Sequence, residues 1–185
     1  MGVLRFQQGD FAGWSLGDGT RVYSANAFFA NAPKHELAAA LERHGLTAEL
    51  STPFNALLVD TGAHRVLIDT GNGVGTAPTV GKLLDNLQAA GFQPEDIDTV
   101  ILTHGHADHA GGAINRANKP TFPNARYLVS RPEWHYWMAE ETALRIGESR
   151  LKPTRRIFDA LRERVSLIEP DAEIVPGIRA LPAPG

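Results

Sequence analysis

Residues 103–112 read Thr-His-Gly-His-Ala-Asp-His-Ala-Gly-Gly, and three of the seven histidines of the protein lie in this stretch. In an extended segment residues i and i+2 point the same way, so His104 and His106 can bind one metal ion. Asp108 and His109 follow a turn and can face a second ion nearby. The stretch therefore predicts a metal centre. Imidazole and carboxylate without thiolate suit Zn²⁺, with Mn²⁺, Fe²⁺ or Co²⁺ as alternatives.

The residues around this motif favour a metal centre over a histidine-rich surface turn or a set of hydrogen-bonded core histidines. The apolar run 98–102 ends at the motif, which is typical of a buried strand that delivers side chains at its C-terminal end. Small residues at 105, 107 and 110–112 let the backbone bend and approach the ions.

The rest of the chain alternates between short apolar runs and helical patterns. Strands are expected over 3–6, 11–16, 21–23, 54–60, 65–68, 98–102, 126–130, 166–168, 173–175 and 178–181, with 54–60 and 65–68 as a hairpin and 17–19 as a turn. Helices are expected over 33–44, 79–90, 132–141 and 154–164. A run of strands followed by alternating strands and helices predicts a mixed α/β fold, in which helices cover the sheets.

The composition limits the class of protein. A length of 185 residues, of which 43% are hydrophobic and 21% are charged, predicts one globular domain over residues 1–185. The absence of cysteine excludes disulfides and thiolate metal sites. A net charge of −3 indicates no nucleic-acid or membrane partner. We expect a small-molecule substrate, on the family resemblance given below. We also expect a cytoplasmic location. The sequence leaves open whether the protein forms a homodimer.

The motif at 103–112 resembles the signature of the metallo-β-lactamase superfamily. Leu67-Ile68-Asp69-Thr70-Gly71 resembles the strand-end motif that precedes this signature in the superfamily. The stretches that look most like the branch containing methyl parathion hydrolase and related lactonases are the helix 33–44, Phe54-Asn55-Ala56-Leu57, and residues 130–137 with Trp134, Tyr136 and Trp137.

This resemblance implies an αββα sandwich with a dinuclear metal site on its edge. His104 and His106 would bind the first metal, and Asp108 and His109 would bind the second. A hydroxide between the metals would attack an ester, a lactone or a phosphoester, because two metals lower the pKa of a bridging water and polarise the scissile group. Asp108 would also steer the water or accept its proton.

The superfamily pattern has three further ligands later in the chain: a third histidine for the first metal, a bridging aspartate and a final histidine. After His109 the sequence has one histidine, His135, which matches none of these positions. Residues 178–185 resemble the lead-in to the turn of the third histidine. We therefore expect an N-terminal portion of a longer protein, with little or no activity by itself. The alternative is a complete, shortened protein in which Asp171 or Glu173 replaces the bridge.

Three other residues are candidates for the site. Asp69 ends a buried strand, where a carboxylate needs partners. It would either accept the N–H of a metal-bound histidine or cap a turn with Thr70 and Gly71. The resemblance to the lactonase branch implies that Trp134 and Trp137 line a substrate pocket. Their helical spacing instead favours a place in the core.

The leading interpretation is a metal-dependent hydrolase. One alternative is an enzyme of the same fold that resembles persulfide dioxygenases, which carry the same histidine pattern and use one iron. Another is a non-catalytic domain that packs against a partner and at most binds metal loosely. The negative charge and the lack of a basic groove disfavour a nuclease.

Overall fold

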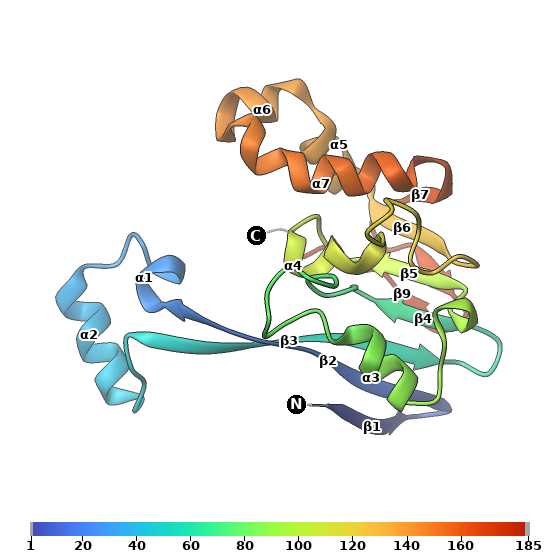
Figure 1. The fold of residues 1–185 in the computed structure, drawn as a ribbon, viewed down its shortest axis with the longest axis horizontal. Coiled ribbons are helices and arrows are strands. Elements are labelled where there is room, and N and C mark those ends of the chain that lie inside the picture. The colour runs from blue at the N-terminus through green and yellow to red at the C-terminus, as the bar shows by residue number, and fades with distance from the viewer. Residues whose placement is uncertain (1, 184–185) are drawn as a thin grey trace.

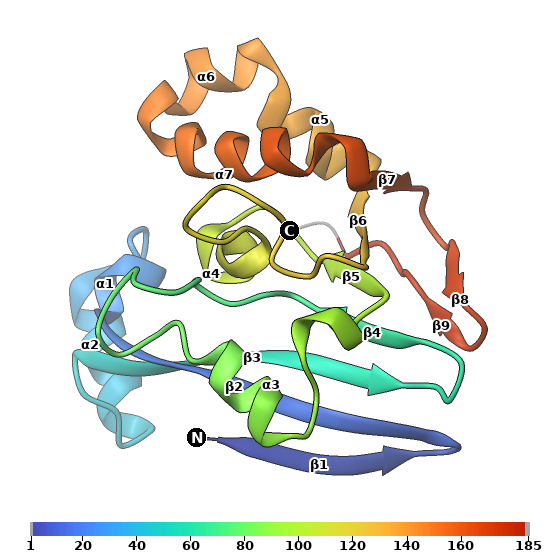
Figure 2. The same ribbon diagram turned by 45° about the vertical axis from the view of Figure 1, so that its right-hand side comes forward.

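A seven-stranded sheet forms the centre of the computed structural model, which describes residues 2–183 (Figures 1 and 2). The strands run in the order β1-β2-β3-β4-β5-β6-β7. Neighbours are antiparallel from β1 to β4 and parallel from β4 to β7. The bounds of the strands are β1 Val3–Gln8, β2 Phe11–Ser24, β3 Glu49–Asp60, β4 Arg65–Ile68, β5 Thr99–Leu102, β6 Arg126–Ser130 and β7 Val165–Ile168. A second sheet pairs β8 Glu173–Val175 with β9 Ile178–Arg179.

Helices cover one face of the large sheet, as Figure 2 shows for α3, α4 and α7. The helix bounds are α1 Ala25–Phe28, α2 Lys34–Arg43, α3 Leu83–Ala89, α4 Ala107–Ala110, α5 Arg131–Met138, α6 Glu140–Ile146 and α7 Glu148–Leu161. Short 3₁₀ turns lie at Pro94–Asp96, Gly111–Ala113 and Arg162–Arg164. Among residues 2–183 no helix is long and apolar enough to cross a membrane.

The two faces of the sheet carry separate apolar clusters, because successive side chains of a strand point to opposite sides. On β6, Tyr127 and Val129 belong to the main core under the helices, whereas Leu128 faces the other way. Leu128 and Val66 pack there with Ile174 and Val175 of β8. The mixed α/β prediction is thus confirmed. The helical layer, the main sheet and the small second sheet stack in that order.

Residues 17–19 do not form the expected turn. β2 is one continuous strand, and a bulge between Gly17 and Gly19 absorbs Asp18 while pairing with β3 continues on both sides. Gly19 has a φ of 126°, and a Cβ built there would lie 2.0 Å from the carbonyl oxygen of Thr79. The glycine pattern marks a close crossing of two segments, which local sequence reasoning mistook for a chain reversal.

The helix expected over 79–90 begins later, at Leu83. Thr79 and Val80 instead pair with the bulge: Thr20 N donates to Thr79 O at 3.1 Å, and Gly19 bridges Val80. Lys82 N then donates to Asp18 O at 3.0 Å. Bonds to β2 therefore take the place of the first helical turn.

The two C-terminal helices also differ from expectation. The helix expected over 132–141 ends at Met138, because Ala139 is extended, and α6 follows it. The helix expected over 154–164 already begins at Glu148 and contains Pro153. The proline deprives the carbonyl of Ser149 of its helical donor, which is tolerated because Ser149 is exposed to solvent.

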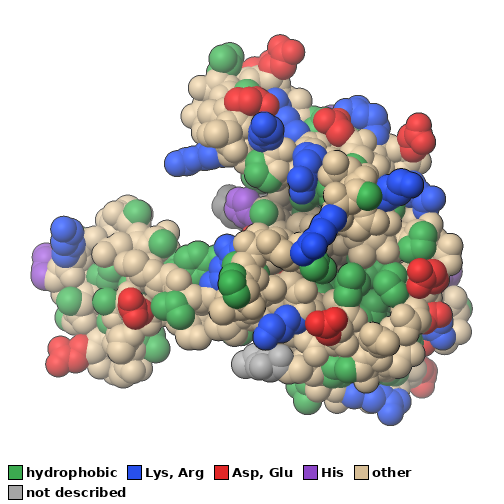
Figure 3. Space-filling view, viewed as in Figure 1, with side chains coloured by type: hydrophobic (Ala, Val, Ile, Leu, Met, Phe, Trp, Pro, Cys, Tyr) green, Lys and Arg blue, Asp and Glu red, His purple; other side chains and the backbone are tan. Residues whose placement is uncertain are grey.

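The far ends of β2 and β3 carry α1 and α2 away from the body as an arm (Figure 1). Figure 3 shows apolar side chains on the surface of this arm. Val22, Phe28, Phe29 and Leu46 are all more than 45% exposed. The arm is therefore peripheral to the core and to the motif at 103–112.

Tyr127 supplies a buried polar link whose loss we expect to be costly. Its hydroxyl donates to Ala113 O at 3.2 Å and accepts from Phe122 N at 3.1 Å, and burial raises its pKa to about 12. Tyr127→Phe leaves Phe122 N without an acceptor, whereas Ala113 O still accepts from Thr121 N. The free energy of unfolding should therefore fall by about 1–3 kcal/mol in urea denaturation at pH 8.

The control is Tyr136→Phe, since Tyr136 is exposed. The folded state favours the neutral phenol of Tyr127. The stability that comes from burying this phenol is therefore complete below pH 10 and is lost as the pH rises toward 12. Equal stability of the two variants at pH 8 would contradict this role.

Candidate metal centre

The motif at 103–112 begins directly after β5 and bends into a short helix. Leu102 is the last strand residue, Thr103 and His104 form a bend, and α4 carries Asp108 and His109. His106 is the residue before α4 and has an extended backbone, with φ −64° and ψ 149°. The strand thus delivers the motif at its C-terminal end, as the sequence indicates, and the short helix provides the expected turn.

The side chains of the predicted ligands lie close together. The ring centroid of His104 lies 4.8 Å from that of His106 and 3.9 Å from that of His109. His109 Nε2 lies 3.6 Å from Asp108 Oδ2. Within residues 2–183, however, no three His, Cys, Asp or Glu side chains form a group that could hold a metal ion. Ligation by His104, His106, Asp108 and His109 therefore stays a prediction.

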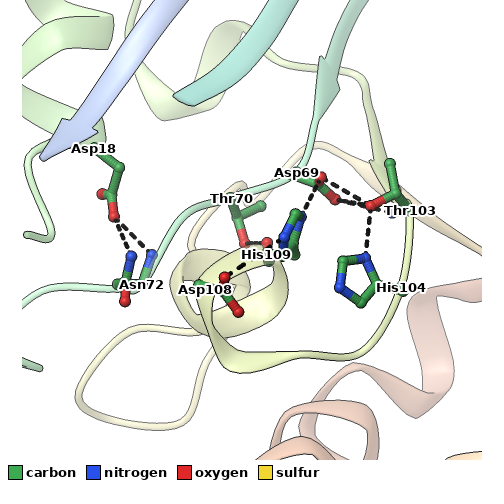
Figure 4. A network of polar contacts seen from close by, with 8 residues as sticks. All are labelled: Asp18, Asp69, Thr70, Asn72, Thr103, His104, Asp108 and His109. Carbon is green, nitrogen blue, oxygen red and sulfur yellow. Dashed lines mark hydrogen bonds and ion pairs between the residues drawn. The ribbon is translucent and has the colours of Figure 1, made fainter. Parts of the chain in front are cut away.

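Asp69 joins the end of β4 to this cluster (Figure 4). Its carboxylate accepts from Thr103 N at 2.8 Å, from Thr103 Oγ1 at 2.9 Å and from His109 Nδ1 at 2.7 Å. The hydrogen bond to Asp69 raises the pKa of His109 above its ordinary value. Of the two roles considered for Asp69, this geometry favours the acceptor for a histidine N–H over a turn cap with Thr70 and Gly71.

The same contacts orient the rings of His104 and His109. The Thr103 hydroxyl donates its proton to Asp69, so its oxygen is left to accept from Nδ1 of His104, 3.0 Å away. Nδ1 of His109 likewise donates to Asp69, so in the neutral form of each ring Nε2 carries the free lone pair. Burial, together with the neighbouring His109 and His106, lowers the pKa of His104, and this favours the neutral form that binds metals.

Asp18 supports the motif from a distance, and sequence reasoning missed it. This fully buried carboxyl group accepts from Asn72 N at 2.8 Å and from Asn72 Nδ2 at 3.0 Å (Figure 4). It also accepts from Leu83 N at 3.2 Å. The loop it fixes includes Thr70, whose N and Oγ1 both donate to His109 O, at 2.7 and 2.8 Å. A Gly-Asp-Gly sequence carries no signal for this role, because it is equally typical of a turn.

The two tryptophans of α5 occupy different places. Trp137 is buried, and its ring centroid lies 5.5 Å from that of His106. Trp134 stacks on Phe158 of α7 at 5.0 Å and packs against the main core. The core interpretation thus fits both residues, since Trp137 is a buried member of the main core and Trp134 packs against it. A place for either residue in a substrate pocket stays a prediction.

A cavity of about 920 Å³ lies on another side of α4. Asp18, Gly73, Gly75, Arg116 and Arg156 are among its lining residues, but none of the predicted metal ligands is. The glycine-rich loop at 72–75 therefore borders a space next to the motif that is separate from the histidine cluster.

The family model described as the metallo-beta-lactamase superfamily matches residues 53–185. The chain belongs to the metallo-β-lactamase superfamily. Two solved structures of this superfamily fold are similar along most of the chain. AidC, described as a dizinc quorum-quenching lactonase in complex with a product N-hexnoyl-L-homoserine, is 26% identical with a TM-score of 0.84, over 94% of this chain and 63% of that one. The hydrolase AbOPH is 30% identical with a TM-score of 0.83, over 94% and 62%.

Two curated relatives of the chain are named lactonases. The N-acyl homoserine lactonase AttM of Rhizobium radiobacter is 34% identical over 111 residues, which cover 50% of this chain and 39% of the relative. The N-acyl homoserine lactonase of Bacillus cereus is 30% identical over 146 residues, covering 74% and 52%. The chain thus spans about half or less of the length of these relatives. The superfamily predicted from the motifs is confirmed, and N-acyl homoserine lactonases are among its relatives.

Proposed function

We propose that the protein containing this chain is a metal-dependent hydrolase that opens lactone rings, with His104, His106, Asp108 and His109 as metal ligands. The observation that carries the proposal is the pair of imidazoles oriented by Asp69 and Thr103 at the end of β5. The lactonase names of the relatives AttM and AidC support a lactone over other esters.

The donor set fits zinc. The Nε2 atoms of His104 and His109 are the ring nitrogens left free by the hydrogen bonds, and Asp108 adds a carboxylate beside His109. A carboxylate that accepts from the other ring nitrogen is the usual support of a metal-binding histidine, and Asp69 has that position. Zinc held there would supply a Lewis acid and lower the pKa of a water molecule.

The residues of the chain have separable roles in this proposal. Asp69 holds the ring of His109 and the backbone of Thr103 in one orientation. Asp108 is partly exposed, so its carboxylate can also take a proton from water during attack on the lactone carbonyl. The ring of Trp137 lies edge-on to that of His106, on the side of the histidine that faces α5.

The test uses the protein that contains this chain, with N-hexanoyl homoserine lactone as the substrate. We expect ring opening that a chelator abolishes and that added Zn²⁺ restores, with zinc found by elemental analysis. Iron at one atom per chain, together with persulfide oxidation and no lactone opening, would refute the proposal in favour of the dioxygenase alternative. Full activity of protein from which the chelator has removed the metal would refute metal dependence altogether.

A further inference from the structure

Gly105, which lies between His104 and His106, is held from two sides by side chains of separate helices. Its backbone N donates to Glu133 Oε1 of α5 at 2.7 Å, and its carbonyl oxygen accepts from Thr154 Oγ1 of α7 at 2.6 Å. Both polar groups of Gly105 are therefore occupied by side chains, in a segment that belongs to neither strand nor helix.

Glu133 and Thr154, which together we call the Gly105 clamp, are themselves fixed. Thr154 is 2% exposed on the buried side of α7. Glu133 Oε1 also accepts from Trp137 Nε1 at 2.5 Å, and Glu133 N donates to the helix-capping hydroxyl of Ser130. The carboxylate therefore has little freedom to follow Gly105 if the loop moves.

The clamp leaves no room for a side chain at position 105. A Cβ built on Gly105 would lie 2.5 Å from Trp137 Nε1 and 2.8 Å from Thr154 Cγ2. The glycine is thus required by the close approach of α5 and α7 and not by an unusual φ. This approach also brings the ring of Trp137 against His106.

We propose that Glu133 and Thr154 are positioning residues, which fix the Gly105 backbone so that His104 and His106 present their rings to one metal ion. The inference rests on the proposed function, because it assumes that these two histidines bind metal. A hydrogen-bonded backbone between two ligands reduces the conformations that the loop must give up on binding, so affinity for the ion rises.

A purely structural role predicts a different result. Thr154→Val would then lower the stability of the metal-free protein and leave its metal affinity unchanged once it is folded. A positioning role predicts weaker metal binding by a protein that is still folded, and recovery with Thr154→Ser, which restores the hydroxyl.

The experiment titrates Co²⁺ into the metal-free full-length protein and follows its d–d absorption, with unfolding curves of each metal-free variant alongside. We expect Thr154→Val to bind Co²⁺ about 10-fold or more weakly than the parent, since loss of groups that orient ligands usually costs 10–100-fold in affinity. Thr154→Ser should recover most of this loss. The matched control is Thr142→Val, which alters a buried threonine of α6.

Glu133→Ala and Glu133→Gln form a second pair, which decides the matter if Thr154→Val does not fold. The glutamine keeps an acceptor oxygen for Gly105 N and Trp137 Nε1, so it should bind Co²⁺ more tightly than the alanine variant does. If Thr154→Val binds Co²⁺ as tightly as the parent, the inference is overturned while the proposed function stands. If Thr154→Val does not fold, parent-like Co²⁺ affinity of Glu133→Ala has the same consequence. A parent protein that binds no Co²⁺ would overturn the proposed function and the inference with it.

Discussion

Replacing His106 by alanine is expected to lower the rate of lactone opening by about 100-fold or more, because removal of a metal ligand should cost at least as much as loss of a group that merely orients one. His106 lies between the clamped Gly105 and the start of α4, so the substitution removes the imidazole and leaves the backbone contacts of the loop in place. Asp108→Ala should be comparably damaging, through the second metal.

The matched control is His135→Ala, which alters an exposed histidine of α5 outside the motif. It should leave turnover within a few-fold of the parent protein. The three variants are compared in one chelator-reversible lactonase assay, with zinc content measured on each sample. Full activity of His106→Ala, together with loss of activity in His135→Ala, would require both the site and the proposed function to be given up.

Asp18→Ala is expected to destabilise the protein by about 3 kcal/mol or more, since hydrogen bonds to a buried carboxyl group are each worth up to about 3 kcal/mol. Its loss leaves Asn72 N and Leu83 N without an acceptor in the core. Asp18→Asn should be nearly as harmful. Oδ2 accepts from Asn72 and Oδ1 from Leu83, so an amide NH₂ in either place would face another donor.

Denaturant unfolding of the metal-free protein measures this effect, with Asp10→Asn at the exposed turn between β1 and β2 as the control. Because Asp18 also fixes the loop that holds His109 O, metal affinity should fall in whatever Asp18→Asn protein remains folded. An Asp18→Asn variant as stable as Asp10→Asn would show that the buried contacts contribute little.

The sequence was most informative where local pattern and chemistry coincide. β6 has the expected bounds, and β5 and α2 lie within a residue of them, because a periodic apolar run between turn residues needs no distant information. The motif at 103–112 follows β5 as predicted, since its spacing depends on a few consecutive residues.

Several of the errors and omissions involve residues whose partners are far away in the chain. The bulge at Asp18 depends on Asn72 and Leu83, and the late start of α3 depends on the same crossing. Glu133 and Thr154 looked like ordinary helix residues, because nothing within their own helices indicates that they bind Gly105. Tertiary contacts of this kind override local propensity and leave no periodic trace in the sequence.

The long-range contacts of Gly105 and His109 have a consequence for the order in which the chain folds. Their partners Glu133, Thr154 and Asp69 lie 28, 49 and 40 residues away in sequence. Each such contact closes a loop whose entropy is lost before the contact forms, and a four-residue helix such as α4 has almost no stability alone. The histidine cluster should therefore assemble late, after β4, α5 and α7 have docked. Zinc added during refolding should accelerate only this last phase and leave the initial collapse unchanged.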